Sequence, residues 1–399
     1  MFKKKKLFKK ITGKLHLWLG LTIGVIVFIE GITGALYVFK DEIQNISRQS
    51  AIYHGEPNPE TKKTLPLLVL EEKVNAYTKE KYPVHWVSIP IDKNESYRFY
   101  YYERNPESSW HYFDEFIIYK SVYINPFTGE IVGVYDEKNG FFGIVLAIHF
   151  SLLLSRPIGS WVVGIATLSF IVMLVTGIIL WWPKNRNMAR QRFWFQWKNI
   201  KKWKRKNYDL HSILGFYSSI FALIIAITGA FYAFRFIPAV IYFIFSAGQT
   251  QYPDMSVYRT TSPDSLRVEN RLDRISETVE TLYPKAYGYS IDLGHEHLDE
   301  HEHPTFSVYV AQNKGSYYIN NEIHFDENTG EVLYNRPHSE KNFGEKVISA
   351  NYDIHVGAIL GLFGKIIAFI VSLICASLPV TGFLVWWGRN NKQKIAKKT

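Results

Sequence analysis

Four histidines stand at matched places in the sequence, and their imidazole side chains could bind a metal. His16 and His211 each lie in a Leu-His-x-x-Leu-Gly motif, and each motif is followed, after eleven residues, by Ile-Thr-Gly-Ala-x-Tyr-x-Phe. The motifs cover residues 15–20 and 32–39 in the first half of the chain, and 210–215 and 227–234 in the second. These identities in fixed register indicate an internal duplication that includes the histidine.

A second pair of histidines follows the same repeat. His149 and His355 precede Trp181 and Trp386, the first residues of two Trp-Trp sequences, by 32 and 31 residues. A two-fold axis between the halves would place His16 opposite His211, and His149 opposite His355. The sequence therefore predicts two symmetry-related histidine pairs.

Paired imidazoles are typical axial ligands of haem iron, and helix bundles hold such cofactors between facing helices. The chain has no C-x-x-C-H motif, so we expect two non-covalent b-type haems, each with two histidine ligands. The small residues Gly20, Gly24 and Gly215 would leave room for a flat macrocycle near the first pair. Copper or zinc at the same histidines is the alternative, but the flanking residues offer no carboxylate or sulfur ligands. A single histidine could also be an interfacial residue that caps a helix.

Long apolar stretches must position these histidines. They cover roughly residues 15–39, 158–182, 212–237 and 359–387. At ~1.5 Å per residue, a helix of about 25 residues exceeds the ~30 Å hydrocarbon core of a bilayer. We therefore expect a membrane protein with a four-helix transmembrane bundle that arose by internal duplication.

The helix that carries His149 cannot run straight to Trp181, because it would be ~48 Å long. Residues 155–159, Ser-Arg-Pro-Ile-Gly, supply a break, and Gly357, Gly361 and Gly364 are a softer counterpart in the second half. The segment with His149 either projects away from the bilayer or folds back toward the bundle, and the sequence leaves both options open.

Basic residues predict the orientation. Residues 1–14 carry seven lysines and no acid, and residues 183–206 carry ten Lys or Arg and no acid. By the positive-inside rule, the termini and this link are cytoplasmic, and the two long connections are outside. Much of the net charge of +10 is thus explained by topology, and we expect a lipid bilayer as partner and no nucleic acid.

The two long connections repeat one pattern, a helical stretch followed by alternating strand-like residues. Residues 125–130 and 326–331 place a polar turn with Thr-Gly-Glu between two such strands, which is typical of a hairpin. We expect two small α+β extracytoplasmic domains. The predicted order is a basic segment with the first span (1–39), an outer domain (40–140), the His149 helix with the second span (141–182), a basic cytoplasmic link (183–206), the third span (207–237), a second outer domain (238–343), the His355 helix with the fourth span (344–387) and a basic cytoplasmic tail (388–399).

The chain resembles the PepSY-associated transmembrane family, which includes iron-regulated inner-membrane proteins and ferric-siderophore reductases. The resemblance rests on the paired His…Ile-Thr-Gly-Ala segments, the Thr-Gly-Glu turns and the Trp-Trp sequences, and it covers nearly the whole chain. It implies PepSY-like outer domains, a location in the bacterial inner (cytoplasmic) membrane, and a haem-dependent reductase that releases Fe(II) from a ferric siderophore. The sequence has no dinucleotide-binding motif of its own, so electrons are expected from a cytoplasmic flavoprotein or from membrane quinol.

Other polar residues could take part. Arg156 and Lys365 fall at the outer boundary and could pair with haem propionates, although lipid headgroups would suit them equally. Glu30 is a lone carboxylate within the first span, with Ile225 as its repeat counterpart. It either snorkels or pairs with another helix, or it has a proton-transfer or charge-balancing role. An outer run of alternating histidines and acids could bind a divalent metal or form a solvated hairpin tip; its histidines are His295, His297, His301 and His303.

Two functions other than a reductase remain open from the sequence. The first is a non-enzymatic membrane module whose outer domains bind a ligand or a peptidase, or take part in signalling. The second is a siderophore permease, although no broken helix marks a substrate site near the midplane.

Overall fold

The computed structural model describes residues 2–79, 82–107, 109–197, 202–250, 260, 262–293 and 305–396. The chain divides into two compact units, and each is discontinuous in sequence. The helix unit comprises residues 1–39, 145–237 and 354–399, and the sheet unit comprises residues 40–144 and 238–353.

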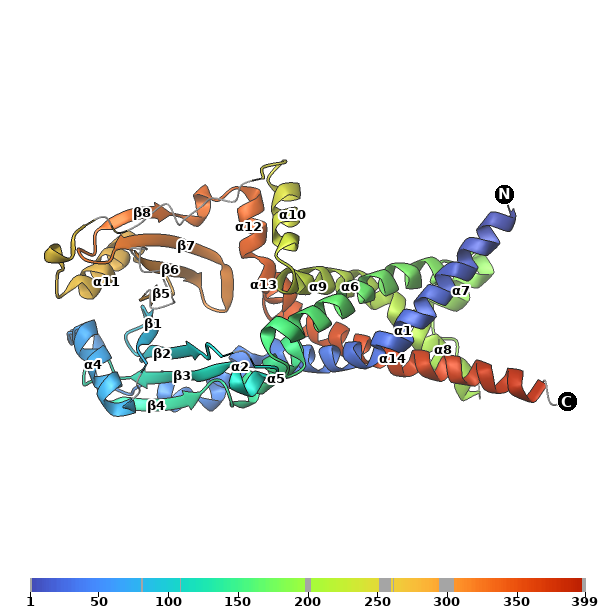
Figure 1. The fold of residues 1–399 in the computed structure, drawn as a ribbon, viewed down its shortest axis with the longest axis horizontal. Helices are drawn as coiled ribbons and strands as arrows, with labels where there is room; N and C mark the ends of the chain where they lie inside the picture. The colour runs from blue at the N-terminus through green and yellow to red at the C-terminus, as the bar shows by residue number, and fades with distance from the viewer. Residues whose placement is uncertain are drawn as a thin grey trace. The chain divides into compact units, whose positions relative to one another are not determined.

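Four long helices form the helix unit: α1 (Phe2–Val38), α6 (Arg156–Trp181), α9 (Gly215–Ala233) and α14 (Gly361–Ala396) (Figure 1). Both α1 and α9 pack against α6 and α14, which closes a four-helix bundle. The shorter helical elements of this unit are α7 (Arg186–Phe193), α8 (Trp203–Asp209), the π-helical turn η3 (Leu210–Leu214) and the 3-10 turn η7 (Ala358–Leu360). Two further helices, α5 (Phe141–Ser151) and α13 (Asn351–His355), begin in the sheet unit and end in the helix unit.

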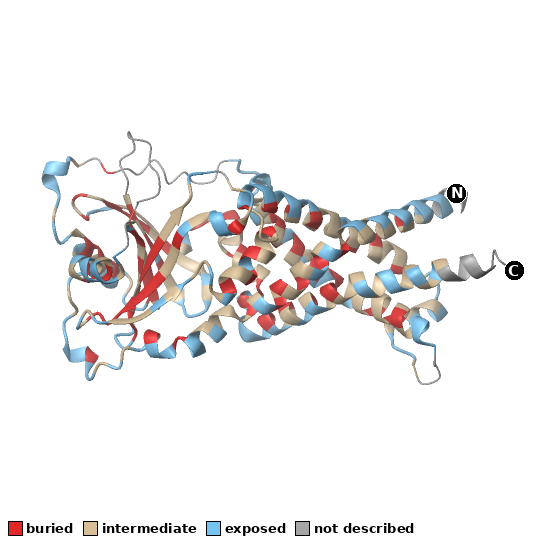
Figure 2. Cartoon of the chain, turned by 60° about the horizontal axis from the view of Figure 1, so that its bottom comes forward, coloured by how far each residue is buried: buried red, intermediate tan, exposed pale blue. Residues whose placement is uncertain are grey.

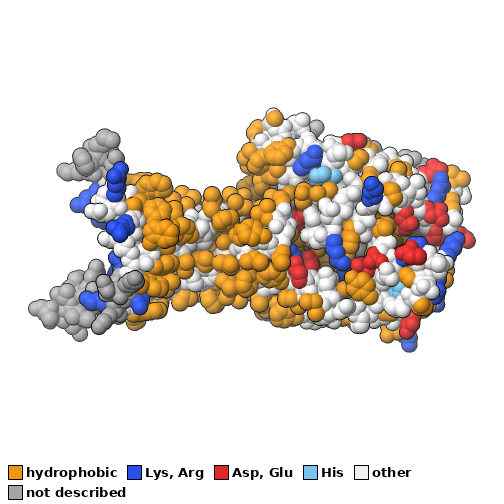
Figure 3. Space-filling view, turned by 180° about the vertical axis from the view of Figure 1, so that it is seen from behind, with side chains coloured by type: hydrophobic (Ala, Val, Ile, Leu, Met, Phe, Trp, Pro, Cys, Tyr) orange, Lys and Arg blue, Asp and Glu red, His pale blue; other side chains and the backbone are white. Residues whose placement is uncertain are grey.

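The surface of the bundle is apolar. Large side chains on all four helices are exposed, among them Val25, Trp161, Ile220 and Ile370. Figure 3 shows hydrophobic side chains over the visible face of these helices, with lysine and arginine gathered at the end that holds the termini. Such a surface needs an apolar solvent. In the part of the chain that the structure describes, four helices are long and apolar enough to span a membrane, within Lys6–Val38, Arg156–Trp181, Trp203–Ala233 and Ala358–Asn390.

These spans confirm the expected membrane protein with four transmembrane helices, with one change at the third. The third span was predicted to reach residue 237, but α9 ends at Ala233 and a separate helix, α10 (Phe236–Phe245), begins after two residues. An apolar run cannot reveal this break, because α10 is itself apolar in sequence.

The predicted breaks after the two later histidines are present. Leu152 and Leu153 have positive φ between α5 and α6, and Pro157 lies in the first turn of α6, where its missing N–H costs nothing. In the second half, Gly357 and Gly361 have φ of 80° and 62° on either side of η7. Each histidine helix is therefore separate from the span that follows it.

The sheet unit contains one antiparallel sheet of eight strands, in the order β4-β3-β2-β1-β5-β6-β7-β8. The first half of the chain supplies β1 (Val84–Pro90), β2 (Tyr97–Arg104), β3 (Phe116–Ile124) and β4 (Ile131–Asp136), and the second half supplies β5 (Gly288–Asp292), β6 (Thr305–Asn313), β7 (Ser316–Asp326) and β8 (Val332–Arg336). The expected hairpin turns join β3 to β4 and β7 to β8, with Gly129 and Gly330 at positive φ.

The prediction of two separate outer domains is wrong. β1 and β5 would each be an exposed edge in a separate domain, and instead they pair with each other, Ser88 opposite Ser290. This pairing satisfies the backbone groups of both edges. It also joins two small hydrophobic cores into one. A separate domain of about 100 residues would bury a smaller fraction of its surface than the joined unit does.

The shared core lies on one face of the sheet. Two helices cover that face, α4 (Leu67–Thr78) and α11 (Arg271–Leu282). Leu70 of α4 and Ile275 of α11 belong to the same buried cluster as Phe99 and Phe325 of the strands. Figure 2 shows the buried residues as continuous stretches along these strands.

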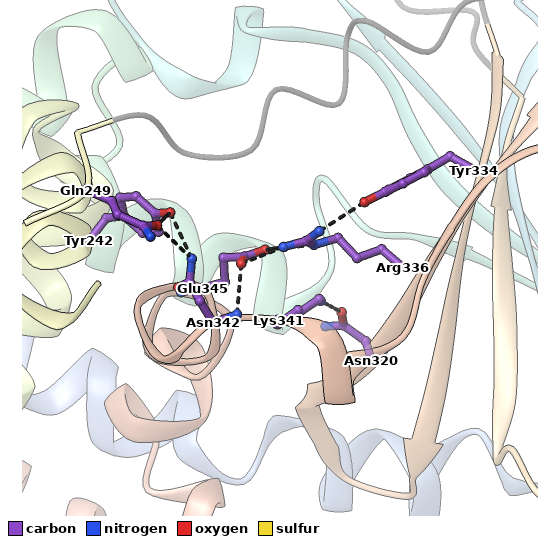
Figure 4. A network of polar contacts seen from close by, with 8 residues as sticks. All are labelled: Tyr242, Gln249, Asn320, Tyr334, Arg336, Lys341, Asn342 and Glu345. Atoms are coloured by element: carbon purple, nitrogen blue, oxygen red, sulfur yellow. Dashed lines mark hydrogen bonds and ion pairs between the residues drawn. The ribbon is translucent and has the colours of Figure 1, made fainter. Parts of the chain in front are cut away.

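The remaining helices of the sheet unit are α2 (Lys40–Ser47), α3 (Gln49–Ile52), most of α10, and α12 (Phe343–Ser349). A polar network fixes α12 to its neighbours (Figure 4). Asn342 and Glu345 form a capping box at its start, Arg336 of β8 donates to Glu345 at 2.6 Å, and Asn342 donates to Tyr242 of α10 at 3.0 Å. Residues 344–353, predicted to belong with the fourth span, therefore belong to the sheet unit.

Candidate functional site

The four histidines form two close pairs within the helix unit, with ring planes at 78° in one pair and 55° in the other. The ring centres of His16 and His211 are 6.4 Å apart, and those of His149 and His355 are 6.2 Å apart. The two rings of a pair come from different halves of the chain in both cases. The structure thus brings together the pairs that the repeat predicts.

These spacings can be compared with those of a metal held between two imidazoles. An imidazole nitrogen binds a metal at about 2.0 Å and its ring centre lies about 1.1 Å farther out, so two imidazoles on opposite sides of one metal have centres about 6.2 Å apart. Both pairs match this value. Among the described residues, no group of three or more His, Cys, Asp or Glu side chains could hold an ion, so the pairs fit two-ligand haem iron better than tetrahedral zinc.

The first pair is anchored by the two spans that precede the Trp-Trp sequences. Nδ1 of His16 lies 3.1 Å from the Met173 carbonyl oxygen and 3.0 Å from Oγ1 of Thr176, both on α6. Nδ1 of His211 has the same two contacts on α14, at 3.1 Å with Leu378 and 3.0 Å with Thr381. His211 itself lies in the π-helical turn η3, a local widening of the helix that is frequent at functional sites.

The second pair is anchored in the same way by α1 and α9. Nδ1 of His149 lies 3.0 Å from Oγ1 of Thr33. Nδ1 of His355 lies 3.0 Å from Oγ1 of Thr228 and 3.1 Å from the Ile225 carbonyl oxygen. Since α5 ends beside α1, the segment with His149 folds back onto the bundle, and the question that the sequence left open is answered.

These contacts assign the tautomer of each ring. Each threonine hydroxyl lies 2.7–3.0 Å from a carbonyl oxygen four residues earlier in its own helix and donates to it. The hydroxyl oxygen and the neighbouring carbonyl can then only accept from the histidine, so Nδ1 carries the proton. Nε2 is the nitrogen that can bind a metal, and the Nδ1–H bond orients it, as is usual for metal-binding histidines.

A glycine beside each threonine completes the arrangement. A Cβ at these glycines would lie only 3.0–3.3 Å from Cε1 of the histidine, so glycine allows the ring to approach the helix backbone. The four threonine–glycine pairs are Thr33-Gly34, Thr176-Gly177, Thr228-Gly229 and Thr381-Gly382.

Only two of these threonine–glycine pairs are part of the repeat motifs described from the sequence, Ile-Thr-Gly in the first and third spans. The Val-Thr-Gly sequences of the second and fourth spans were not predicted to belong to the site. The signal was available, because a β-branched residue followed by Thr-Gly occurs in every span, although the first span also has a second copy, Ile11-Thr12-Gly13. The sequence could not show that each threonine receives a histidine from a different helix.

Gly20, Gly24 and Gly215 do not leave the space for a flat macrocycle that the sequence predicts. A Cβ at these positions would meet Met173, Pro379 and Leu378 at 3.3, 3.2 and 3.5 Å, respectively. These glycines therefore allow close packing of neighbouring helices. The glycines that contact the histidines are those of the threonine–glycine pairs.

The two pairs lie toward opposite ends of the bundle. On α1, His16 and the Thr33 that anchors His149 are 33 − 16 = 17 residues apart, which corresponds to about 25 Å along the helix axis. This distance is most of the hydrocarbon thickness of a bilayer.

The other predicted site residues have different outcomes. Arg156 is exposed at the start of α6, with its guanidinium 4.9 Å from the centre of the Phe150 ring, and Lys365 is buried on α14. Their pairing with propionates stays a prediction. The acidic and histidine-rich run that contains His295, His297, His301 and His303 lies outside the described residues.

A comparison with models of protein families identifies the family of this chain. The model of the PepSY-associated TM region matches residues 14–389. The chain belongs to the PepSY-associated transmembrane family. A search of curated proteins finds no match. The family match includes all four histidines and all four threonine–glycine pairs, and membership confirms the resemblance drawn from the sequence.

Proposed function

We propose that this member of the PepSY-associated transmembrane family is a di-haem b reductase that carries electrons across the membrane to a ferric chelate, namely a ferric siderophore. The observation that supports this function is the pair of histidine sites, each with its Nδ1 atoms anchored, its Nε2 atoms available and its ring spacing suited to one metal. When bound, two b haems supply one-electron relays within the span.

The protein itself would place and hold these groups. His16 with His211, and His149 with His355, would hold the two haem irons, and the threonine–glycine pairs would fix the direction of each Nε2. Arg156 and Lys365 are proposed partners of the propionates.

The proposed direction of electron transfer follows from the distribution of basic residues along the chain. Both termini and the basic link 183–206 lie in the cytoplasm of a bacterium, and the sheet unit lies outside its inner membrane. Electrons come from a cytoplasmic flavoprotein or from membrane quinol. The acceptor is the chelated ferric ion, which takes up one electron and is released as Fe(II), because hard oxygen ligands hold the reduced ion less tightly.

The test is anaerobic reduction followed by mixing with a ferric siderophore and a ferrous-iron trap. The purified haem-loaded protein should be reoxidised by the ferric siderophore with formation of the Fe(II) complex, and a variant with His149→Ala and His355→Ala should form none. A non-enzymatic ligand-binding or signalling module would show no dependence on these histidines. A permease would move the intact chelate into vesicles without reducing it. Either of these results would contradict the proposed function.

A further inference from the structure

The four histidine anchors are alike except at one position. Each histidine faces a helix at a threonine and at the residue three positions before that threonine. These four preceding residues are Glu30, Met173, Ile225 and Leu378. Three of them can offer only a backbone carbonyl to Nδ1, and Glu30 adds a carboxylate.

The Glu30 carboxylate reaches the histidine that its helix anchors. Oε2 of Glu30 lies 3.2 Å from Nδ1 of His149, beside Oγ1 of Thr33 on the same nitrogen. Oε1 of Glu30 is buried and has no hydrogen-bond partner among the described residues. A carboxylate within a membrane span is costly, so its position against a candidate metal ligand calls for a functional explanation.

A carboxylate at this place acts on the metal through the imidazole. It accepts from the Nδ1–H group and makes Nε2 a more basic ligand. A more basic imidazole ligand favours the ferric state of the iron. This effect lowers the reduction potential at this one site, and among the described residues no Asp or Glu side chain is seen in contact with His16 or His211.

We propose that Glu30 is a positioning residue that makes the His149–His355 haem the lower-potential haem of the two. The inference rests on the proposed function. His149 is held near the end of α1, from which the chain continues into the sheet unit. A lower potential there suits an acceptor that is hard to reduce, as a tightly chelated ferric ion is.

The experiment is an optical redox titration of the purified haem-loaded protein, with the ferric electron paramagnetic resonance spectrum as a second readout. In Glu30→Gln and Glu30→Ile, the ratio of reduced to oxidised haem at a fixed potential should rise about tenfold for one of the two haems. This change is about 59 mV for one electron. Glu30→Ile places an isoleucine three residues before Thr33, as Ile225 stands three residues before Thr228 in the anchor of His355.

Two further backgrounds identify the haem that responds. With His16→Ala and His211→Ala, the remaining haem should still shift when Glu30 is replaced. With His149→Ala and His355→Ala, replacement of Glu30 should leave the remaining haem unchanged. The double variant Glu30→Ile with Ile225→Glu moves the carboxylate to the other ring of the same pair and should restore the low potential.

The outcomes separate this inference from the function on which it rests. Two bound haems whose potentials and resonance spectra are unchanged in Glu30→Gln and Glu30→Ile would overturn the role of Glu30 and leave the proposed function standing. A shift of the haem held by His16 and His211 would overturn it as well. A wild-type protein that binds no haem would overturn the proposed function itself.

Discussion

At the scale of single residues, the site is defined less by the histidines than by what holds them. Each ring has a threonine hydroxyl on Nδ1 and a glycine against Cε1, and a backbone carbonyl oxygen joins the hydroxyl at His16, His211 and His355. The threonine uses its own proton within its helix, so the ring has only acceptors to face. Four repeats of this small set leave the proton on Nδ1 in all four rings.

Replacement of Thr176 by valine should weaken haem binding at the first pair. The change removes the Oγ1 acceptor from His16 and keeps the side-chain shape, and loss of such an orienting contact costs ~10-fold or more in metal affinity. Titration of the haem-free protein with haem measures the effect. Thr167→Val is the control, because Thr167 makes the same bond within α6, to the Val163 carbonyl, and none of its hydrogen bonds reaches a histidine. Equal affinity in both variants would contradict the role given to Thr176.

At the scale of elements, a buried ion pair connects the start of α3 to the end of β4. Arg48 donates to both carboxylate oxygens of Glu137, and Ser121 donates to one of them at 2.6 Å. Burial alone would raise the pKa of Glu137, but the hydrogen bonds from Arg48 and Ser121 outweigh it, so the pKa lies below its ordinary value of 4.5. A carboxyl with a lowered pKa stabilises the folded state above pH 4.5, and this contribution is lost as the pH falls through the folded pKa.

Arg48→Met should therefore destabilise the sheet unit. The two side chains are only 10% and 14% exposed, and removal of one partner from a buried pair costs about 3–5 kcal/mol. Denaturant unfolding followed by tryptophan fluorescence, at pH 7 and at pH 4, measures the effect. The destabilisation should be smaller at pH 4, where protonation of Glu137 relieves the unpaired charge.

The matched control is Arg274→Met, which breaks the exposed pair of Arg274 with Glu331. Those side chains are 47% and 63% exposed, so the expected cost is below about 1 kcal/mol. Equal destabilisation in the two variants would mean that burial does not govern the Arg48 pair.

Much of this arrangement can be predicted from the sequence. The parts that cannot be predicted share one cause, because they depend on contacts between elements that are distant in the chain. Apolar length predicts the four spans, and the repeat predicts which histidines meet. The merger of two domains into one sheet could not be predicted, because the pattern within β1 and β5 is the same whether an edge strand is free or paired. The contacts of Thr176 and Thr381 also depend on the neighbouring helix, and no periodicity within one helix reveals them.

At the scale of the whole molecule, the proposed electron transfer requires the basic link and the sheet unit to be on opposite sides of the membrane. Lys93 of the sheet unit and Arg186 of the link are both exposed. The one cysteine of the chain, Cys375, is buried in α14. Single added cysteines can therefore report sidedness with little background.

A membrane-impermeant thiol reagent should label Lys93→Cys in bacterial cells whose outer membrane has been made permeable. It should label Arg186→Cys only after the inner membrane is disrupted, since the proposed orientation places the basic link in the cytoplasm. The unmodified chain, with buried Cys375 alone, is the control and should stay unlabelled. Labelling of both variants before disruption, or in the reverse order, would contradict the orientation.

The central claim is that the two histidine pairs each hold one haem, and haem content tests it most directly. The measurement is the reduced-minus-oxidised absorption spectrum of the purified protein, with haem and protein quantified in the same sample. The account predicts a b-type spectrum with two haems per chain, falling to one in His16→Ala with His211→Ala and to one in His149→Ala with His355→Ala. A colourless wild-type protein after expression with added haem, or a haem content that does not change in these variants, would contradict it.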